Sequence, residues 1–140
     1  MYRKKTCNHV HGCGFVVNPK FPFLGASPDG KVCDPFATGI LEVKCPFIMR
    51  DRTIKEALAD EVMKKKICIE QIQDKVQMKR DHMYWYQVQG QLLVTGAKFC
   101  EFVLFTRQDL FIERIEPDQN TMEQIFTKMV NVFEGFVCEK

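Results

Sequence analysis

The sequence has no apolar run long enough to span a membrane, and no apolar signal-peptide core follows its basic start at residues 1–5. It also lacks internal repeats and low-complexity segments. With 140 residues, of which 46% are hydrophobic and 27% charged, the composition is typical of one globular domain over residues 1–140. We therefore expect an intracellular protein of the nucleus or cytoplasm that makes no membrane contact.

The net charge is small, +2, but it is unevenly distributed along the chain. Residues 1–100 carry 16 Lys and Arg against 10 Asp and Glu, whereas residues 101–140 carry 4 against 8. The basic excess of the longer part suits a polyanionic partner, although many basic surfaces are only solvated.

Cysteine is abundant, but its count of seven is odd. Cys45, Cys68 and Cys100 lie within apolar periodic segments. The odd count and this placement predict reduced, buried thiols rather than a disulfide framework.

A separate group of metal-ligating residue types lies near the start of the chain, at Cys7, His9, His11 and Cys13. Four such residues within seven positions could bind zinc. The spacing is not that of a zinc finger, and a strand would place the four side chains too far apart for one ion unless the chain bends. Zinc binding at this group stays an open alternative.

The most informative feature is a Glu-x-Lys triplet on an apolar run, Glu42 to Lys44, with Asp29 in a turn upstream. Because side chains alternate along a strand, Glu42 and Lys44 face one side while Leu41 and Val43 face the other. Two carboxylates can bind a hard divalent cation, and a nearby ammonium can act on a phosphate or a water. The alternative is a surface Glu–Lys pair beside a turn whose Asp only caps its own backbone.

The rest of the pattern predicts strands alternating with helices. Strands are expected at 14–17, 23–26, 31–33, 39–45, 99–106 and 110–115, and helices at 52–62, 82–94 and 122–136. Asp81 is expected to cap the second helix and Gly96 to end it. Residues 64–80 are expected to form a loop with a short hairpin. This order indicates an α/β fold with a mixed sheet.

Three motifs, read in order, carry a family resemblance: FLGASPDG at 23–30, LEVKCPF at 41–47 and YWYQVQGQL at 84–92. This order resembles the YqaJ-type viral recombinase family, the lambda-exonuclease-like branch of the PD-(D/E)xK nucleases. The resemblance runs from about Cys13 to about Pro117. It implies a nuclease-like core, in which a mixed β-sheet is flanked by helices.

The resemblance also implies roles for individual residues. Asp29 and Glu42 would bind Mg²⁺ or Mn²⁺, with the backbone carbonyl of Val43 as a further ligand. Lys44 would act on the attacking water or on the phosphate. Gln87, on the helix after the Glu-x-Lys strand, would help to position the metal and the water.

Candidate DNA contacts are Ser27, Arg50, Arg52 and Tyr84. Cations such as Arg50 and Arg52 supply affinity for phosphates without reading sequence, and the family places an arginine close to DNA at the position of Arg50. Tyr84 could stack on a base, as could Trp85 and Tyr86, although core packing is the expectation for at least two of these three aromatics.

The match departs from the family at one place. In the family a helix precedes this region and supplies another acidic residue near the metal, whereas only twelve residues precede Cys13 here and none is acidic. We therefore expect that the N-terminal helix is missing, that the domain is truncated and that it is weakly active by itself.

Together these features predict a metal-dependent DNA nuclease, with an exonuclease of the viral-recombinase type as the leading interpretation. Its partner would be duplex DNA with free ends, and the phage members of the family make an oligomer possible. Two alternatives stay open: a non-catalytic remnant of the fold that binds nucleic acid or a protein, and an endonuclease on the same core. The sequence leaves DNA and RNA substrates undistinguished.

Overall fold

The computed structural model describes residues 9–11, 16–17, 25–26 and 28–138. Their main sheet has the strand order β1-β4-β5-β8-β9, formed by β1 (His9–His11), β4 (Gly30–Cys33), β5 (Thr38–Lys44), β8 (Cys100–Phe105) and β9 (Leu110–Ile115). β5 and β8 run parallel, and the other neighbours are antiparallel. The sheet is therefore mixed, as the sequence predicts.

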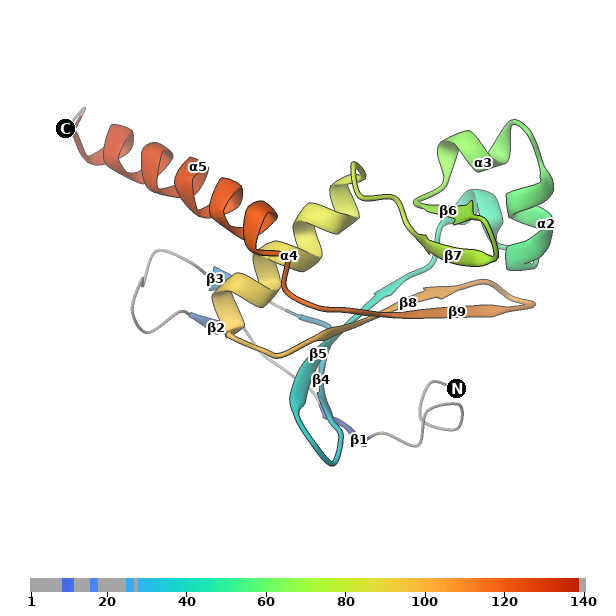
Figure 1. Ribbon diagram of the computed structural model, residues 1–140, viewed down its shortest axis with the longest axis horizontal. Coiled ribbons are helices and arrows are strands. Elements are labelled where there is room, and N and C mark those ends of the chain that lie inside the picture. The colour runs from blue at the N-terminus through green and yellow to red at the C-terminus, as the bar shows by residue number, and fades with distance from the viewer. Residues whose placement is uncertain (1–8, 12–15, 18–24, 27, 139–140) are drawn as a thin grey trace.

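The connection from β5 to β8 contains most of the remaining elements and lies above the sheet in the view of Figure 1. It comprises η1 (Phe47–Met49), α2 (Ile54–Ala59), α3 (Met63–Lys66), β6 (Ile69–Ile72), β7 (Lys75–Met78) and α4 (Met83–Thr95). β6 and β7 pair as a hairpin, which confirms the hairpin expected within 64–80. α5 (Gln119–Cys138) follows β9 and extends away from the sheet.

Two short strands, β2 (Val16–Val17) and β3 (Gly25–Ala26), pair antiparallel and lie beside α4. They fall within the strands expected at 14–17 and 23–26, whose other residues lie outside the described part of the chain.

The helices differ from expectation at their ends, for local reasons. The helix expected at 52–62 stops after Ala59, because Asp60 leaves the helical conformation and its Oδ1 accepts hydrogen bonds from the amides of Val62 and Met63. α4 is capped by His82 rather than by Asp81, since His82 Nδ1 accepts from the amide of Tyr84 at 3.1 Å. Gly96 ends α4 at φ 68°, as expected.

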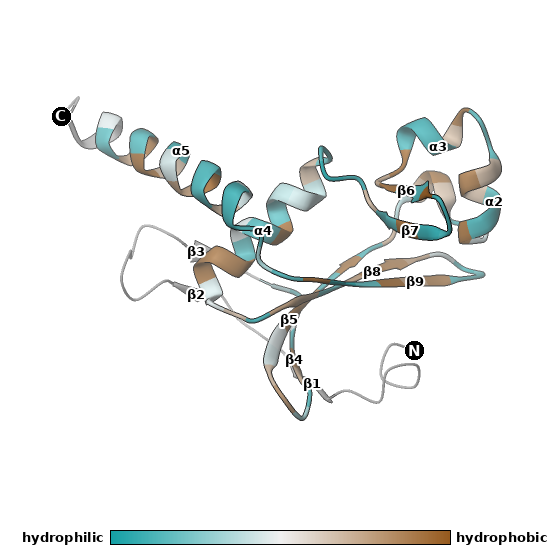
Figure 2. Cartoon of the chain, viewed as in Figure 1, coloured by the Kyte–Doolittle hydropathy of each residue, from teal (hydrophilic) through white to brown (hydrophobic). Residues whose placement is uncertain are grey.

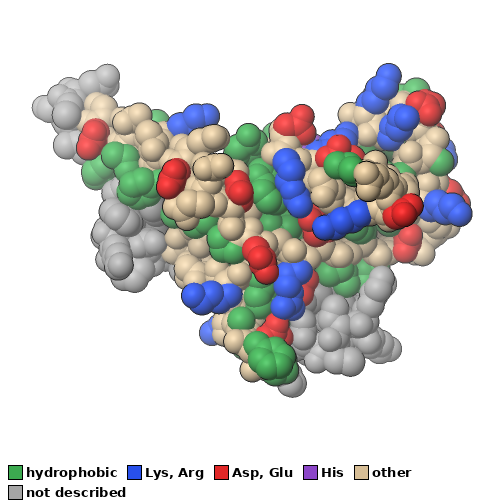
Figure 3. Space-filling model, in the orientation of Figure 1, with side chains coloured by type: hydrophobic (Ala, Val, Ile, Leu, Met, Phe, Trp, Pro, Cys, Tyr) green, Lys and Arg blue, Asp and Glu red, His purple; other side chains and the backbone are tan. Residues whose placement is uncertain are grey.

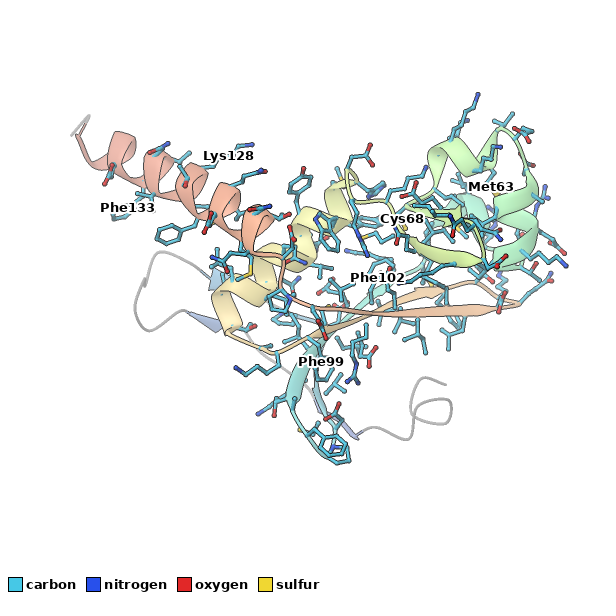
Figure 4. All side chains as sticks on the ribbon, viewed as in Figure 1. Met63, Cys68, Phe99, Phe102, Lys128 and Phe133 are labelled. Atoms are coloured by element: carbon cyan, nitrogen blue, oxygen red, sulfur yellow. The ribbon has the colours of Figure 1, made fainter. Side chains whose placement is uncertain are left out.

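The larger apolar core lies between the sheet and α4, and it includes Ile40, Phe102, Val88 and Leu92. Figure 4 labels Phe102 in this layer, and Figure 2 shows apolar colour along much of β8. A smaller cluster on the opposite face contains Val32, Leu41, Phe99 and Val103. β5 thus has apolar side chains on both faces, so a charged side chain at its centre is enclosed by the fold.

Gly39 is required by this packing. A Cβ at Gly39 would overlap the ring of Phe99, so a larger residue would displace a buried aromatic. The start of β5 therefore packs closely against Phe99, the residue directly before β8.

Candidate active site

Asp29 lies directly before β4, and the hairpin brings it across to the Glu-x-Lys strand. Its backbone amide donates to the carbonyl of Leu41 at 3.0 Å, and its Oδ2 accepts from the amide of Val43 at 2.8 Å. These two bonds flank Glu42 along β5. The Asp29 carboxylate is therefore fixed to the strand that carries the second carboxylate, although 13 residues separate them in sequence.

Glu42 is at the centre of β5 and only 3% exposed. One carboxylate oxygen, Oε1, accepts a hydrogen bond of 2.8 Å from Gln91 Nε2 on α4. The other, Oε2, is 3.7 Å from Lys44 Nζ, two residues along the same face of the strand. The alternation expected for the triplet is thus present, because Glu42 and Lys44 lie together on the face covered by α4.

Burial raises the pKa of the Glu42 carboxyl above its ordinary value, and the negative charge of Asp29 raises it further. The hydrogen bond from Gln91 and the charge of Lys44 act in the opposite direction but do not cancel the effect. A buried carboxylate beside a second carboxylate is stabilised by an additional cation. The electrostatics of the site therefore favour binding of positive charge.

Lys44 is held above an aromatic ring. Its Nζ lies 4.8 Å from the centroid of the Tyr84 ring, which is itself 6.3 Å from the ring of Phe102 in the core. A cation over a ring face is attracted by the ring quadrupole, so Tyr84 limits the positions that the ammonium can take. Tyr84 is half-buried, Trp85 is buried and Tyr86 is exposed, which agrees with core packing for two of these three aromatics.

Gln87 and Gln91 are one helical turn apart on α4, but the structure places them differently. The Gln87 side chain is exposed, and its predicted role in positioning metal and water stays a prediction. Gln91 is the glutamine that contacts Glu42. Its sequence signal is a polar residue four positions after Gln87 within an otherwise apolar stretch of helix.

Gln91 has a second unusual property. Its Oε1 is buried and has no hydrogen-bond partner among the groups that the structure describes. An unsatisfied buried acceptor costs about 1–3 kcal/mol. Such atoms are exceptions that call for an explanation, and this one lies beside the candidate catalytic carboxylate.

Two of the predicted DNA contacts, Arg50 and Arg52, lie beyond the end of β5. The Arg50 guanidinium stacks 3.7 Å from the centroid of the exposed Phe47 ring and lies 3.4 Å from Asp51. Asp51 also pairs with Arg107 at 3.0 Å, so this surface is only partly neutralised. Arg52 is exposed, and Ser27 lies outside the described residues. In Figure 3, basic and acidic side chains are interspersed over the visible face rather than separated.

The chemistry of the donor set fits a hard divalent cation. Mg²⁺ is commonly held by one or two carboxylates together with waters and substrate phosphates. Asp29, in the bend before β4, and Glu42, on β5, supply two carboxylates. Among the residues with described positions, no group of three or more His, Cys, Asp or Glu side chains is arranged to hold a metal. The side chains of Cys7, His9, His11 and Cys13 fall outside this description.

The thiols are partly as expected. Cys33, Cys45, Cys68 and Cys100 are free, and Cys68 and Cys100 are buried. Burial raises the pKa of Cys68 to about 11 and that of Cys100 higher still. The expectation for Cys45 is wrong: it is exposed, because it follows the last paired residue of β5 and extends beyond the sheet.

Comparison with known proteins identifies the family of the chain. The YqaJ-like viral recombinase domain family matches residues 1–98, which is most of the chain. The chain belongs to this family. The fold and the resemblance expected from the three motifs are thereby confirmed. A comparison with curated proteins finds no match.

Two solved structures are similar over 99% of this chain at 26% identity. One is an alkaline exonuclease (LHK-Exo) from Laribacter hongkongensis, with a TM-score of 0.69, and the other is LHK-Exo in complex with dAMP, with a TM-score of 0.71. In both cases the match covers 62% of the exonuclease chain. The chain described here therefore spans less than two thirds of the proteins it matches.

Proposed function

We propose that this YqaJ-like chain is a Mg²⁺- or Mn²⁺-dependent deoxyribonuclease that degrades duplex DNA from its ends. The observation that supports it best is that Asp29, Glu42 and Lys44 lie together along β5. Asp29 Oδ2 accepts from the amide of Val43 at 2.8 Å, and Lys44 Nζ lies 3.7 Å from Glu42 Oε2. Membership of a viral recombinase family and similarity to an alkaline exonuclease that has been solved with dAMP support the choice of substrate.

In this proposal, the carboxylates of Asp29 and Glu42 bind the cation, with the carbonyl of Val43 as a further ligand. When bound, the cation supplies Lewis-acid chemistry, because it lowers the pKa of a water and neutralises charge on the phosphate. Lys44 orients the water or stabilises the negative charge that develops on the phosphate. Burial of Glu42 strengthens the interactions of its own carboxylate, since they act in a region of lower dielectric constant than water, whereas Asp29 is exposed.

The remaining predicted residues act on the substrate. Arg50 and Arg52 lie just beyond the Glu-x-Lys strand and would contact phosphates, while Tyr84 and Ser27 would line the approach of the DNA strand. Gln87 is exposed on the helix that covers the site, where it would be available to a bound substrate and its water.

The test is a digestion of end-labelled linear duplex, covalently closed circular duplex and a matched RNA duplex, each with Mg²⁺, Mn²⁺ or a chelator. We expect the linear DNA alone to be degraded, and only with metal present. Glu42→Gln, prepared in parallel, controls for a contaminating nuclease. Nicking of the circle would instead identify an endonuclease, and no cleavage of any substrate with either metal would favour a non-catalytic binding domain.

Within the residues that the structure describes, none of the helices combines the length and apolar character needed to cross a bilayer.

A further inference from the structure

The Glu42 carboxylate is held at both of its oxygens by groups of different kinds. Gln91 Nε2 donates to Oε1 at 2.8 Å, and Lys44 Nζ lies 3.7 Å from Oε2. A terminal carboxylate rotates about a broad, weakly restricted torsion unless its oxygens are bonded. The short bond from a helix that packs on the strand therefore sets the plane of this carboxylate.

The orientation of the Gln91 amide shows which contact dominates. Gln91 is 7% exposed, its NH₂ group faces Glu42, and its Oε1 has no described partner. The reverse orientation would place an amide oxygen against a carboxylate oxygen, which is repulsive. The side chain thus leaves one of its own polar atoms unsatisfied and retains the bond to Glu42.

A second buried glutamine on the same helix behaves differently. Gln89 is 0% exposed, its Nε2 donates to the carbonyl of Glu116 at 3.0 Å, and its Oε1 accepts from the amide of Asp118 at 2.8 Å. Both ends of Gln89 are satisfied by backbone groups between β9 and α5. Gln89 therefore serves the fold, and it offers a matched comparison for Gln91.

We propose that Gln91 is a positioning residue, which fixes the Glu42 carboxylate for binding of the divalent cation. The inference rests on the proposed function, because it assigns Gln91 a role toward the metal ligand of that site. Groups that orient a metal ligand typically change metal affinity or activity by about 10–100-fold when they are removed. A neutral donor suits this role, because it orients the carboxylate without competing with the cation as a second positive charge would.

The experiment compares Gln91→Met and Gln89→Met, which remove the amide and nearly preserve side-chain length. Mn²⁺ affinity is measured by calorimetric titration of the whole chain, without DNA. We expect Gln91→Met to weaken Mn²⁺ binding about tenfold, and Gln89→Met to leave Mn²⁺ affinity unchanged while lowering the melting temperature. Gln91→Asn is a second variant: it keeps an amide but is one methylene too short for the bond, and the same loss is expected.

Kinetics on linear duplex give an independent readout. The Gln91 variants should need about tenfold more Mn²⁺ for half-maximal rate, while KM for DNA stays constant. Unchanged Mn²⁺ affinity in both Gln91 variants, with the wild type binding normally, would overturn this inference alone. An equal loss in Gln89→Met would also overturn it, because the effect would then be one of helix packing. A wild-type chain that binds no Mn²⁺ would overturn the inference together with the proposed function.

Discussion

Two buried glutamates lie on adjacent parallel strands of this sheet, and their surroundings are opposite in kind. Glu42 on β5 is 3% exposed, and Glu101 on β8 is 4% exposed. In the register of the two strands, Glu42 is paired with Phe102 and Leu41 with Glu101, so the two carboxylates point to opposite faces. Similar burial at neighbouring positions therefore isolates the effect of the partners.

Glu101 is paired with a cation at short range, and that cation also bonds a second carboxylate. Arg114 on β9 donates to its Oε1 from both Nε, at 2.9 Å, and Nη2, at 2.7 Å. The same guanidinium donates to Asp34 at 2.7 Å and stacks 3.8 Å from the Phe99 ring. That hydrogen bond lowers the pKa of Asp34. This arrangement uses every nitrogen of the guanidinium within the fold.

Glu42 has a weaker set of partners. Its cation, Lys44, is 3.7 Å away, and its short hydrogen bond comes from a neutral amide. Burial and the nearby Asp29 charge consequently raise its pKa. Burial alone therefore does not distinguish a functional carboxylate from a structural one. What distinguishes them is whether the fold itself supplies the compensating positive charge.

The largest expected effect separates the two glutamates directly. Glu42→Gln, and likewise Asp29→Asn, should reduce cleavage of linear DNA roughly a thousandfold or more, because each removes a metal ligand. Neither should destabilise the fold, since the amide oxygen introduced by Asp29→Asn can still accept from Val43, and the amide introduced by Glu42→Gln carries no charge to bury. Glu101→Gln should keep cleavage within about twofold but lower stability by about 1–3 kcal/mol, because Arg114 loses one of its two anionic partners.

Initial rates with Mn²⁺ and thermal melting in chelator are the two measurements for this set. Near-normal cleavage by Glu42→Gln would show that Glu42 is not a metal ligand of the active site. Loss of cleavage in a folded Glu101→Gln would show that the structural assignment of Glu101 is wrong.

A smaller loss of cleavage is expected when Lys44 is replaced. Lys44 is the cation nearest to Glu42, at 3.7 Å. Lys44→Ala should reduce cleavage about a hundredfold or more if the ammonium acts on the water or the phosphate. Mn²⁺ affinity should be retained or slightly increased, because a competing positive charge near the carboxylates is removed. Calorimetric titration with Mn²⁺ measures the metal affinity, and a single-turnover digestion measures the cleavage rate. Parallel losses of affinity and rate would make Lys44 a structural residue.

Much of the scaffold around Glu42 was predictable because its signals are local. The turn at Pro28–Gly30 and the alternation of residues 41–44 give the hairpin, and Gly96 gives the end of α4. The helix ends that differ depend on side chains whose capping role is decided by neighbouring geometry, as at Asp60 and His82. The local sequence pattern therefore predicts whether a segment is a helix or a strand better than it predicts where that helix or strand ends.

The contacts that distinguish the two glutamates were not predictable in the same way. Gln91 meets Glu42 across 49 residues of sequence, and Arg114 joins Glu101 to Asp34 across 80. No periodicity encodes such pairs, because they depend on strand order and on how α4 crosses the sheet. Sequence motifs identified Asp29, Glu42 and Lys44 as candidates, and helical spacing places Gln91 on the same face as Gln87. The contacts of Gln91 with Glu42 and of Arg114 with Glu101 emerge only from the packed structure.

The smallest expected effect concerns stability on the Glu101 side of the sheet. Arg114→Met should lower the free energy of unfolding by about 2 kcal/mol, between the values for exposed and buried pairs, because Arg114 is partly exposed while Glu101 is not. The double variant Glu101→Met/Arg114→Met should recover much of this loss, since it leaves no uncompensated carboxylate at position 101. Asp34 also loses Arg114, but it keeps its hydrogen bonds from the amides of Phe36 and Ala37. Chemical denaturation in urea at neutral pH measures both, and cleavage per folded molecule should stay unchanged. A double variant no more stable than Arg114→Met would mean that the guanidinium stabilises the sheet through Phe99 and Asp34 rather than through Glu101.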